Sequence, residues 1–181
     1  MKRILLILAD GFEEIEALGT ADVLRRLEMA VTLAGLNSRS VTGAHGMVVT
    51  ADCELCAVAD DGFDAVILPG GMPGAANLDK SLLVDKVLKK AASNRQIIAA
   101  ICAAPFVLAK RGLLDGKRFT MYPGFESELG GLTYTGEPAE VDGNIITGKG
   151  PGAVFAFAGA VAGALGKGVE CEKLYQGMFI D

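Results

Sequence analysis

The chain has no tryptophan, only one histidine and fewer basic than acidic residues. Seventeen Lys and Arg against 22 Asp and Glu give a net charge of −5, so the basic excess that attracts nucleic acid or an anionic membrane surface is missing. One histidine, His45, and four dispersed cysteines are a poor supply of zinc ligands. We therefore expect no nucleic-acid partner, no membrane partner and no metal ion.

Long hydrophobic runs are also missing. The N-terminal apolar run ends at Ala9 and acidic residues follow at once, which argues against a secretory signal peptide. Residues 151–166 are uncharged but short for a membrane span and rich in Ala and Gly, so they predict a fully buried helix. A chain that is 51% hydrophobic needs no disulfide framework. Together these features predict a cytoplasmic protein with reduced thiols.

Nucleotide-binding motifs and internal boundaries are missing as well. Neither the G-x-G-x-x-G fingerprint nor a Walker pattern occurs, and no repeat, low-complexity segment or linker divides the 181 residues. We therefore expect one domain spanning residues 1–181, without a cofactor.

What the chain does contain is an alternation of apolar and amphipathic segments. Continuous apolar runs predict buried strands at residues 2–9, 29–34, 64–68 and 96–101. Helical spacing predicts helices at residues 13–28, 81–92, 103–111, 153–165 and 169–176. A short edge pair is expected around residues 45–51, and residues 141–146 have the pattern of a hairpin. The alternation predicts an α/β fold, a mostly parallel sheet with helices on both faces.

One cysteine lies where such folds place their reactive groups. An apolar strand leads into Cys102, small alanines flank it, and Pro105 suits the first turn of a helix. This is the pattern of a nucleophile elbow, a sharp strand-to-helix turn that small neighbours permit. A helix N-terminus favours the thiolate, so we expect Cys102 to be reactive, although a buried and inert cysteine in a tight turn has the same pattern.

Two further segments end at the same predicted edge of the sheet. The turn containing Gly70 and Gly71 could direct backbone N–H groups at an oxygen near the thiol, although a bare turn has the same sequence. Glu16 lies between apolar residues at the start of the first predicted helix, where burial would raise its pKa. We expect Glu16 to exchange a proton with Cys102 and act as a general acid and base.

The remaining cysteines carry weaker signals. Cys53 and Cys56 form a C-x-x-C pattern, but acidic neighbours disfavour thiolates there and the predicted position is not a helix start after a strand. We therefore expect no redox or metal function of the pair, and its role stays open.

These residues together resemble the ThiJ/PfpI superfamily, and within it the DJ-one-like branch, the relatives of the Parkinson-disease protein. The matching stretches lie in order along the chain, at residues 4–17, 21–26, 31–36, 64–71, 74–78, 97–105 and 147–158. The resemblance implies a flavodoxin-like three-layer sandwich, a homodimer, a nucleophilic and oxidisable Cys102, a protonated Glu16 and an oxyanion pocket formed by the N–H groups of Gly71 and Ala103.

The resemblance also implies activities. Members are known as glutathione-independent glyoxalases, which act on methylglyoxal, as deglycases of early methylglyoxal adducts of proteins or thiols, and as redox sensors or chaperones. The expected partners are thus a small reactive aldehyde or a glycated protein or thiol. The alternative is a non-catalytic sensor or chaperone in which Cys102 becomes a sulfinate. An old label links some members to thiamine thiazole synthesis.

Two departures from the family pattern bear on the mechanism. Ala103 follows Cys102 where protease-type relatives have a histidine, which argues against a protease. Tyr122 precedes Pro123 where DJ-one-like proteins often have a histidine. Tyrosine is no base at neutral pH, so proton transfer would depend on Glu16.

Overall fold

The computed structural model describes residues 1–180, and its centre is a seven-stranded sheet in the order β10-β11-β7-β6-β1-β2-β5. All strands are parallel except β10, which pairs antiparallel with β11. Their bounds are β1 Arg3–Leu8, β2 Ala30–Gly35, β5 Cys53–Glu54, β6 Ala65–Leu68, β7 Ile97–Ile101, β10 Ala139–Asp142 and β11 Ile145–Gly148. The central strands are buried on both faces, as their unbroken apolar sequences predict.

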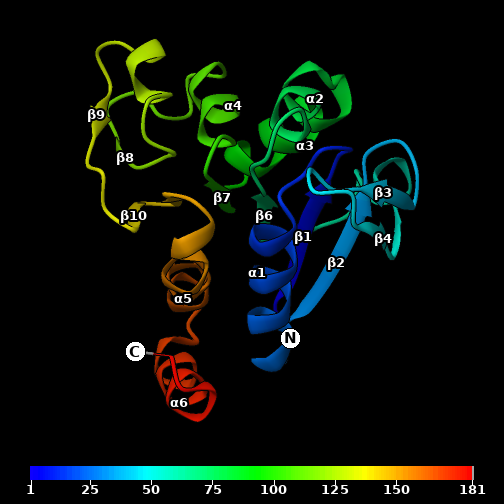
Figure 1. The fold of residues 1–181 in the computed structure, drawn as a ribbon, viewed down its shortest axis with the longest axis vertical. Coiled ribbons are helices and arrows are strands. Elements are labelled where there is room, and N and C mark those ends of the chain that lie inside the picture. The colour runs from blue at the N-terminus through cyan, green and yellow to red at the C-terminus, as the bar shows by residue number, and fades with distance from the viewer. Residues whose placement is uncertain (181) are drawn as a thin grey trace.

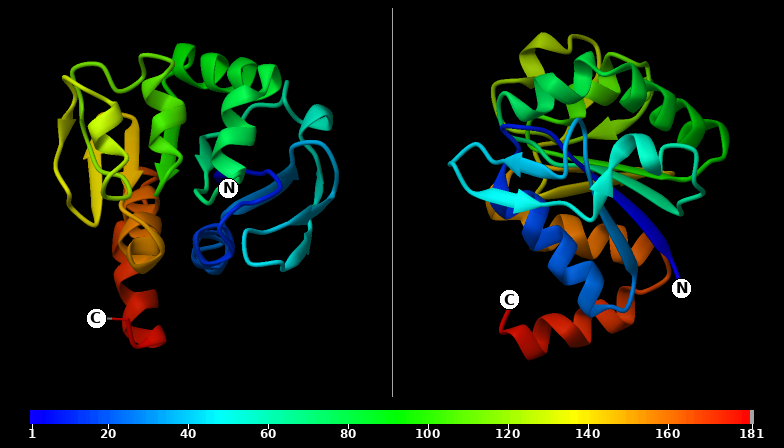
Figure 2. Two further views of the ribbon diagram at one scale, coloured as in Figure 1. Left: turned by 45° about the horizontal axis from the view of Figure 1, so that its top comes forward. Right: turned by 90° about the vertical axis from the view of Figure 1, so that its right-hand side faces the viewer.

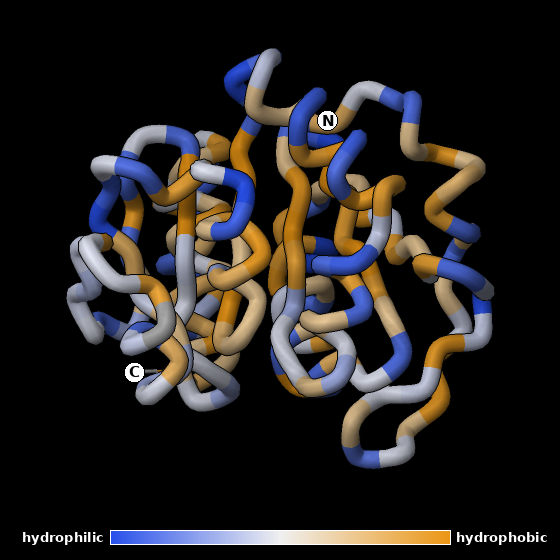
Figure 3. The backbone as a smooth tube through the Cα atoms, turned by 90° about the horizontal axis from the view of Figure 1, so that it is seen from above, coloured by the Kyte–Doolittle hydropathy of each residue, from blue (hydrophilic) through white to orange (hydrophobic). Residues whose placement is uncertain are grey.

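Helices cover both faces of the sheet, which gives the three layers expected of a flavodoxin-like fold (Figures 1 and 2). One face carries α1 Glu14–Arg26, α5 Val154–Ala164 and α6 Gly168–Met178, and the other carries α2 Gly74–Lys80, α3 Leu82–Ser93 and α4 Pro105–Ala109. The side chains form two hydrophobic cores, one on each side of the sheet. Figure 3 shows hydrophobic segments in the interior and hydrophilic ones in many outer loops.

Short elements complete the structure. The expected edge pair is a hairpin of β3 Ser40–Thr42 and β4 Val48–Thr50, and β8 Arg118–Phe119 pairs with β9 Thr133–Tyr134. Three 3-10 turns lie at η1 Leu55–Ala57, η2 Glu126–Glu128 and η3 Pro151–Ala153. Helix α2 was not expected from the sequence. Its start is held by a tertiary contact, the bond from the Gly74 N–H to the Gly11 carbonyl at 3.1 Å.

Helix α5 differs from its prediction in how far it is buried. It was predicted to be fully buried, but Phe155 is 40% exposed, and only one face of the helix packs against the sheet and α1. Small residues make the hydrophobic pattern of this segment continuous, so its sequence does not distinguish the outer face from the inner one. No helix within residues 1–180 is long and apolar enough to cross a membrane.

Candidate active site

Cys102 lies at the carboxyl end of β7, on a sharp turn that leads into α4. Its φ of 63° is in the left-handed region, which few residues other than glycine adopt. Two backbone hydrogen bonds hold it there: its N–H donates to the Gly148 carbonyl, and its carbonyl accepts from the Tyr122 N–H, both at 2.9 Å. The neighbouring strand and the following loop thus maintain this strained conformation, a pattern found at functional sites.

The turn after β6 contacts the same sulfur. The backbone N–H groups of Gly71 and Ala103 lie close enough to the Cys102 thiol to lower its pKa. Gly70 allows the close approach, since a Cβ on it would lie 2.6 Å from both the Cys102 Cβ and a Glu16 carboxyl oxygen. Gly70, Gly71 and Ala103 therefore lie around the sulfur, where two N–H groups could bind an oxyanion.

Glu16 reaches this turn from the first turn of α1. Its Oε2 accepts a hydrogen bond from the Gly70 N–H at 2.8 Å, and its own N–H donates to the Oε2 of Glu13, the helix cap, at 2.7 Å. The Glu16 side chain is 1% exposed, and its Oε1 is buried without a hydrogen-bond partner. Glu16 and Cys102 lie close enough for each to shift the pKa of the other.

The two buried groups compete for one proton. Burial raises the pKa of Glu16 to about 7. Burial and the Glu16 carboxylate raise the pKa of the Cys102 thiol to about 12, against the influence of the Gly71 and Ala103 N–H groups. The expectation that the helix N-terminus alone favours the thiolate is therefore wrong, because α4 is only five residues long and Cys102 is 8% exposed. The thiolate becomes favourable when the proton resides on Glu16, which removes the opposing charge.

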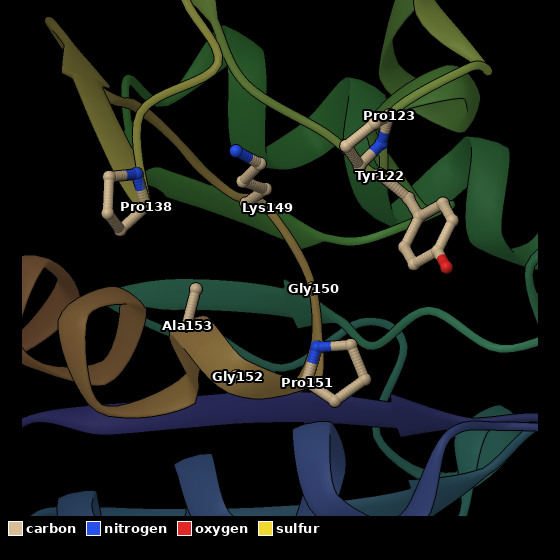
Figure 4. Close-up of a pocket in the computed structure, with 8 residues that line it drawn as sticks. All are labelled: Tyr122, Pro123, Pro138, Lys149, Gly150, Pro151, Gly152 and Ala153. Carbon is tan, nitrogen blue, oxygen red and sulfur yellow. The ribbon is translucent and has the colours of Figure 1, made fainter.

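Tyr122 lies beside the elbow but not on the sulfur. Its backbone bonds to Cys102, while its side chain is 46% exposed and packs edge-on against Phe125 at 6.2 Å between ring centres. The ring lines a cavity of about 530 Å³ that continues along the segment after β11 (Figure 4). Sequence reasoning did not identify this segment, Lys149 to Ala153, as part of the site. Its position after a strand at the functional edge of the sheet was the available signal.

A second cluster of polar side chains lies at the start of α1. Glu14, which is 2% exposed, accepts hydrogen bonds from the N–H and the ring Nδ1 of His45, both at 2.7 Å. Burial opposes ionisation of Glu14, but the bonds from His45 and Met47 outweigh it and lower its pKa. The atoms of Glu13, Glu14 and His45 that could ligate a metal, carboxylate oxygens and a ring nitrogen, lie within 4.8 Å of one another. This spacing could hold a metal ion. In this structure the hydrogen bonds of Glu14 link the β3–β4 hairpin to α1.

The other cysteines are remote from this chemistry. Cys53 lies on edge strand β5 and Cys56 in the turn after it, and both are unpaired thiols, as is the buried Cys171 on α6. Burial and the nearby Asp52 raise the pKa of Cys53, which disfavours its reactive form.

Comparison with known proteins agrees with this geometry. The profile of the DJ-1/PfpI family matches residues 2–164. The chain belongs to this family. Protein dj-1beta of Drosophila melanogaster is 41% identical over 99% of this chain and 97% of its own length. Its crystal structure superposes on 99% of this chain and 98% of its own with a TM-score of 0.95.

Two other members of the DJ-1/PfpI family have names that state an activity. A deglycase of Pyrococcus abyssi is 32% identical and covers 86% of this chain and 94% of its own. A glutathione-independent glyoxalase of Caenorhabditis elegans is 34% identical and covers 86% of this chain and 83% of its own.

Proposed function

We propose that this DJ-1/PfpI protein converts methylglyoxal, or its early adducts with thiols and amines, to lactate through Cys102. The observation that carries the proposal is the meeting at one sheet edge of a strained cysteine, two backbone N–H groups near its thiol and a buried carboxyl group with a raised pKa. A carboxyl group that titrates near neutral pH is suited to general acid and base catalysis. The deglycase and the glyoxalase among the relatives support the same chemistry.

The proposed mechanism needs no histidine. Glu16 takes the proton of Cys102, and the thiolate adds to the aldehyde carbon to form a hemithioacetal whose oxygen the Gly71 and Ala103 N–H groups bind. Glu16 passes the thiol proton to that oxygen and, ionised again, takes the proton of the same carbon and delivers it to the neighbouring carbon. The hydroxyl proton moves to the neighbouring oxygen, which gives a lactoyl thioester. Water hydrolyses the thioester and restores the thiol, so the sum for free methylglyoxal is one dicarbonyl and one water to one lactate. With an adduct, the thiolate displaces the carrier thiol or amine from the same carbon, and the carrier leaves with the proton held by Glu16; the sum is then one adduct and one water to one lactate and one free carrier.

The test of this function is the formation of lactate from methylglyoxal in the absence of glutathione, followed by NMR. The same assay with preformed methylglyoxal adducts of an amine and of a thiol distinguishes a glyoxalase from a deglycase. If native protein with an intact Cys102 forms no lactate from any of these, the proposal is wrong.

The second candidate function is redox sensing, because Cys102 is slightly exposed and two backbone N–H groups lie near its thiol, where they could bind sulfinate oxygens. Two equivalents of hydrogen peroxide convert its thiolate to a sulfinate and release two waters. The unpartnered Oε1 of Glu16, when protonated, could donate to one of the new oxygens. We expect mild peroxide to add two oxygen atoms to the native chain and not to Cys102→Ser. Equal mass gain in both proteins would refute this role.

We also propose that two copies of the chain form a homodimer through α1. Ile15 on α1 is 59% exposed, and Met47 and Val48 on the hairpin bonded to α1 are 56% and 63% exposed. These exposed apolar side chains lie on two elements that are bonded to each other, and apolar side chains that gather on one surface mark an interaction site. We expect light scattering to give twice the chain mass, and Ile15→Glu to give monomers. Leu82→Glu, on the opposite side of the sheet, is the control that should remain dimeric; a dimeric Ile15→Glu would contradict this interface.

A further inference from the structure

The cavity next to the elbow is larger than the small dicarbonyl requires. It encloses about 530 Å³ and is lined by Tyr122, Pro123, Pro138, Lys149, Gly150, Pro151, Gly152 and Ala153. Pockets of several hundred Å³ bind molecules much larger than the three-carbon methylglyoxal. The volume therefore fits the aldehyde together with the molecule that carries it.

Two walls of the cavity are attached to the reactive cysteine itself. Tyr122 forms one wall, and its N–H is hydrogen-bonded to the Cys102 carbonyl. The opposite wall begins directly after Gly148, whose carbonyl accepts the Cys102 N–H. Cys102 itself does not line the cavity, but both of the segments bonded to its backbone do, so the cavity adjoins the elbow.

Lys149 is the only charged residue of the lining, which otherwise consists of prolines, small residues and one tyrosine. In Figure 4 its side chain lies between Pro138 and Pro123, and the backbone of residues 150–153 passes below it. It is partly buried, and its Nζ donates one hydrogen bond, to the Gly136 carbonyl at 3.0 Å. Among the described side chains, no carboxylate forms an ion pair with it.

A half-buried ammonium group with unused donors and no counter-charge favours an anionic ligand. We propose that this cavity binds the carrier part of a methylglyoxal adduct, and that Lys149 selects carriers with a carboxylate or phosphate group. This inference rests on the proposed function and specifies its substrate class. The preferred substrate is then an anionic thiol or amine adduct rather than free methylglyoxal.

Matched ligands test this selection. The methylglyoxal adduct of N-acetylcysteine carries a carboxylate, and that of N-acetylcysteinamide is its neutral counterpart; the adducts of phosphopantetheine and pantetheine are the corresponding phosphate pair. A charged hydrogen bond predicts a kcat/KM about tenfold higher for the anionic member of at least one pair. Which pair shows the preference distinguishes carboxylate from phosphate recognition.

Lys149→Met should abolish the preference, with little change for the neutral adducts, and Lys149→Arg should keep it. Binding is measured separately by calorimetry, with Cys102→Ser protein and the unreactive S-acetonyl derivatives of N-acetylcysteine and its amide. We expect about tenfold tighter binding of the anionic derivative, lost in the Lys149→Met double variant. Equal binding of both derivatives, and equal turnover of both members of each pair, overturns the inference. A binding preference without Cys102-dependent lactate would instead refute the proposed function alone.

Discussion

Replacing Cys102 by serine is expected to lower lactate formation from methylglyoxal at least about a thousandfold, because loss of the nucleophile removes the covalent step. The serine hydroxyl has a far higher pKa than the thiol and cannot form the anion beside a buried Glu16. The fold should persist, because the backbone bonds of residue 102 to Gly148 and Tyr122 do not involve its side chain.

Cys56→Ser is the matched control, since Cys56 is an exposed free thiol outside the site. It should keep the native rate. Lactate formation by Cys102→Ser at a rate near that of the native protein would show that the cysteine is not the nucleophile. If native protein is also inactive while alkylation shows a reactive Cys102, redox sensing becomes the better assignment.

Glu16→Gln is expected to lower kcat by a hundredfold to a thousandfold, because glutamine preserves the shape of the side chain but transfers no proton. Its amide oxygen can still accept the bond from the Gly70 N–H, so the turn should stay in place. Glu172→Gln, on the exposed surface of α6, is the control and should not change the rate. An unchanged kcat in Glu16→Gln would remove Glu16 from the mechanism.

The same substitution should increase stability in a pH-dependent manner. Glu16 has a pKa of 4.5 in the unfolded chain and about 7 in the folded one, so its contribution is complete below pH 4.5 and is lost as the pH rises through 7. At 1.36 kcal/mol per pH unit, the native protein loses about 3 kcal/mol relative to Glu16→Gln over this interval. Urea unfolding of both proteins at about pH 4 and about pH 8 measures the difference. A constant difference would show that the carboxyl group is not titrating in the folded state.

Much of the site follows from local sequence. An apolar run, small alanines around Cys102 and Pro105 suffice to predict a strand, a sharp turn and a helix, because each depends on backbone sterics within a few residues. The order of strands and helices predicts that the turn at Gly70, the elbow and Glu16 meet at one edge, since parallel strands end at the same side of a sheet.

The tertiary structure decided the rest. The pKa of the Cys102 thiol depends on how deeply the side chain is buried and on the ionised Glu16 beside it. Neither the burial nor the closeness of Glu16 is encoded in local sequence. The cavity that adjoins the elbow, with Lys149 in its lining, arises from loops that are distant in the chain and packed together. The exposed side of α5 likewise depends on what packs over it. Sequence by itself predicted most of the strands and helices and singled out Cys102; burial, charge proximity and the shape of the pocket required the folded chain, because they are properties of contacts between distant segments.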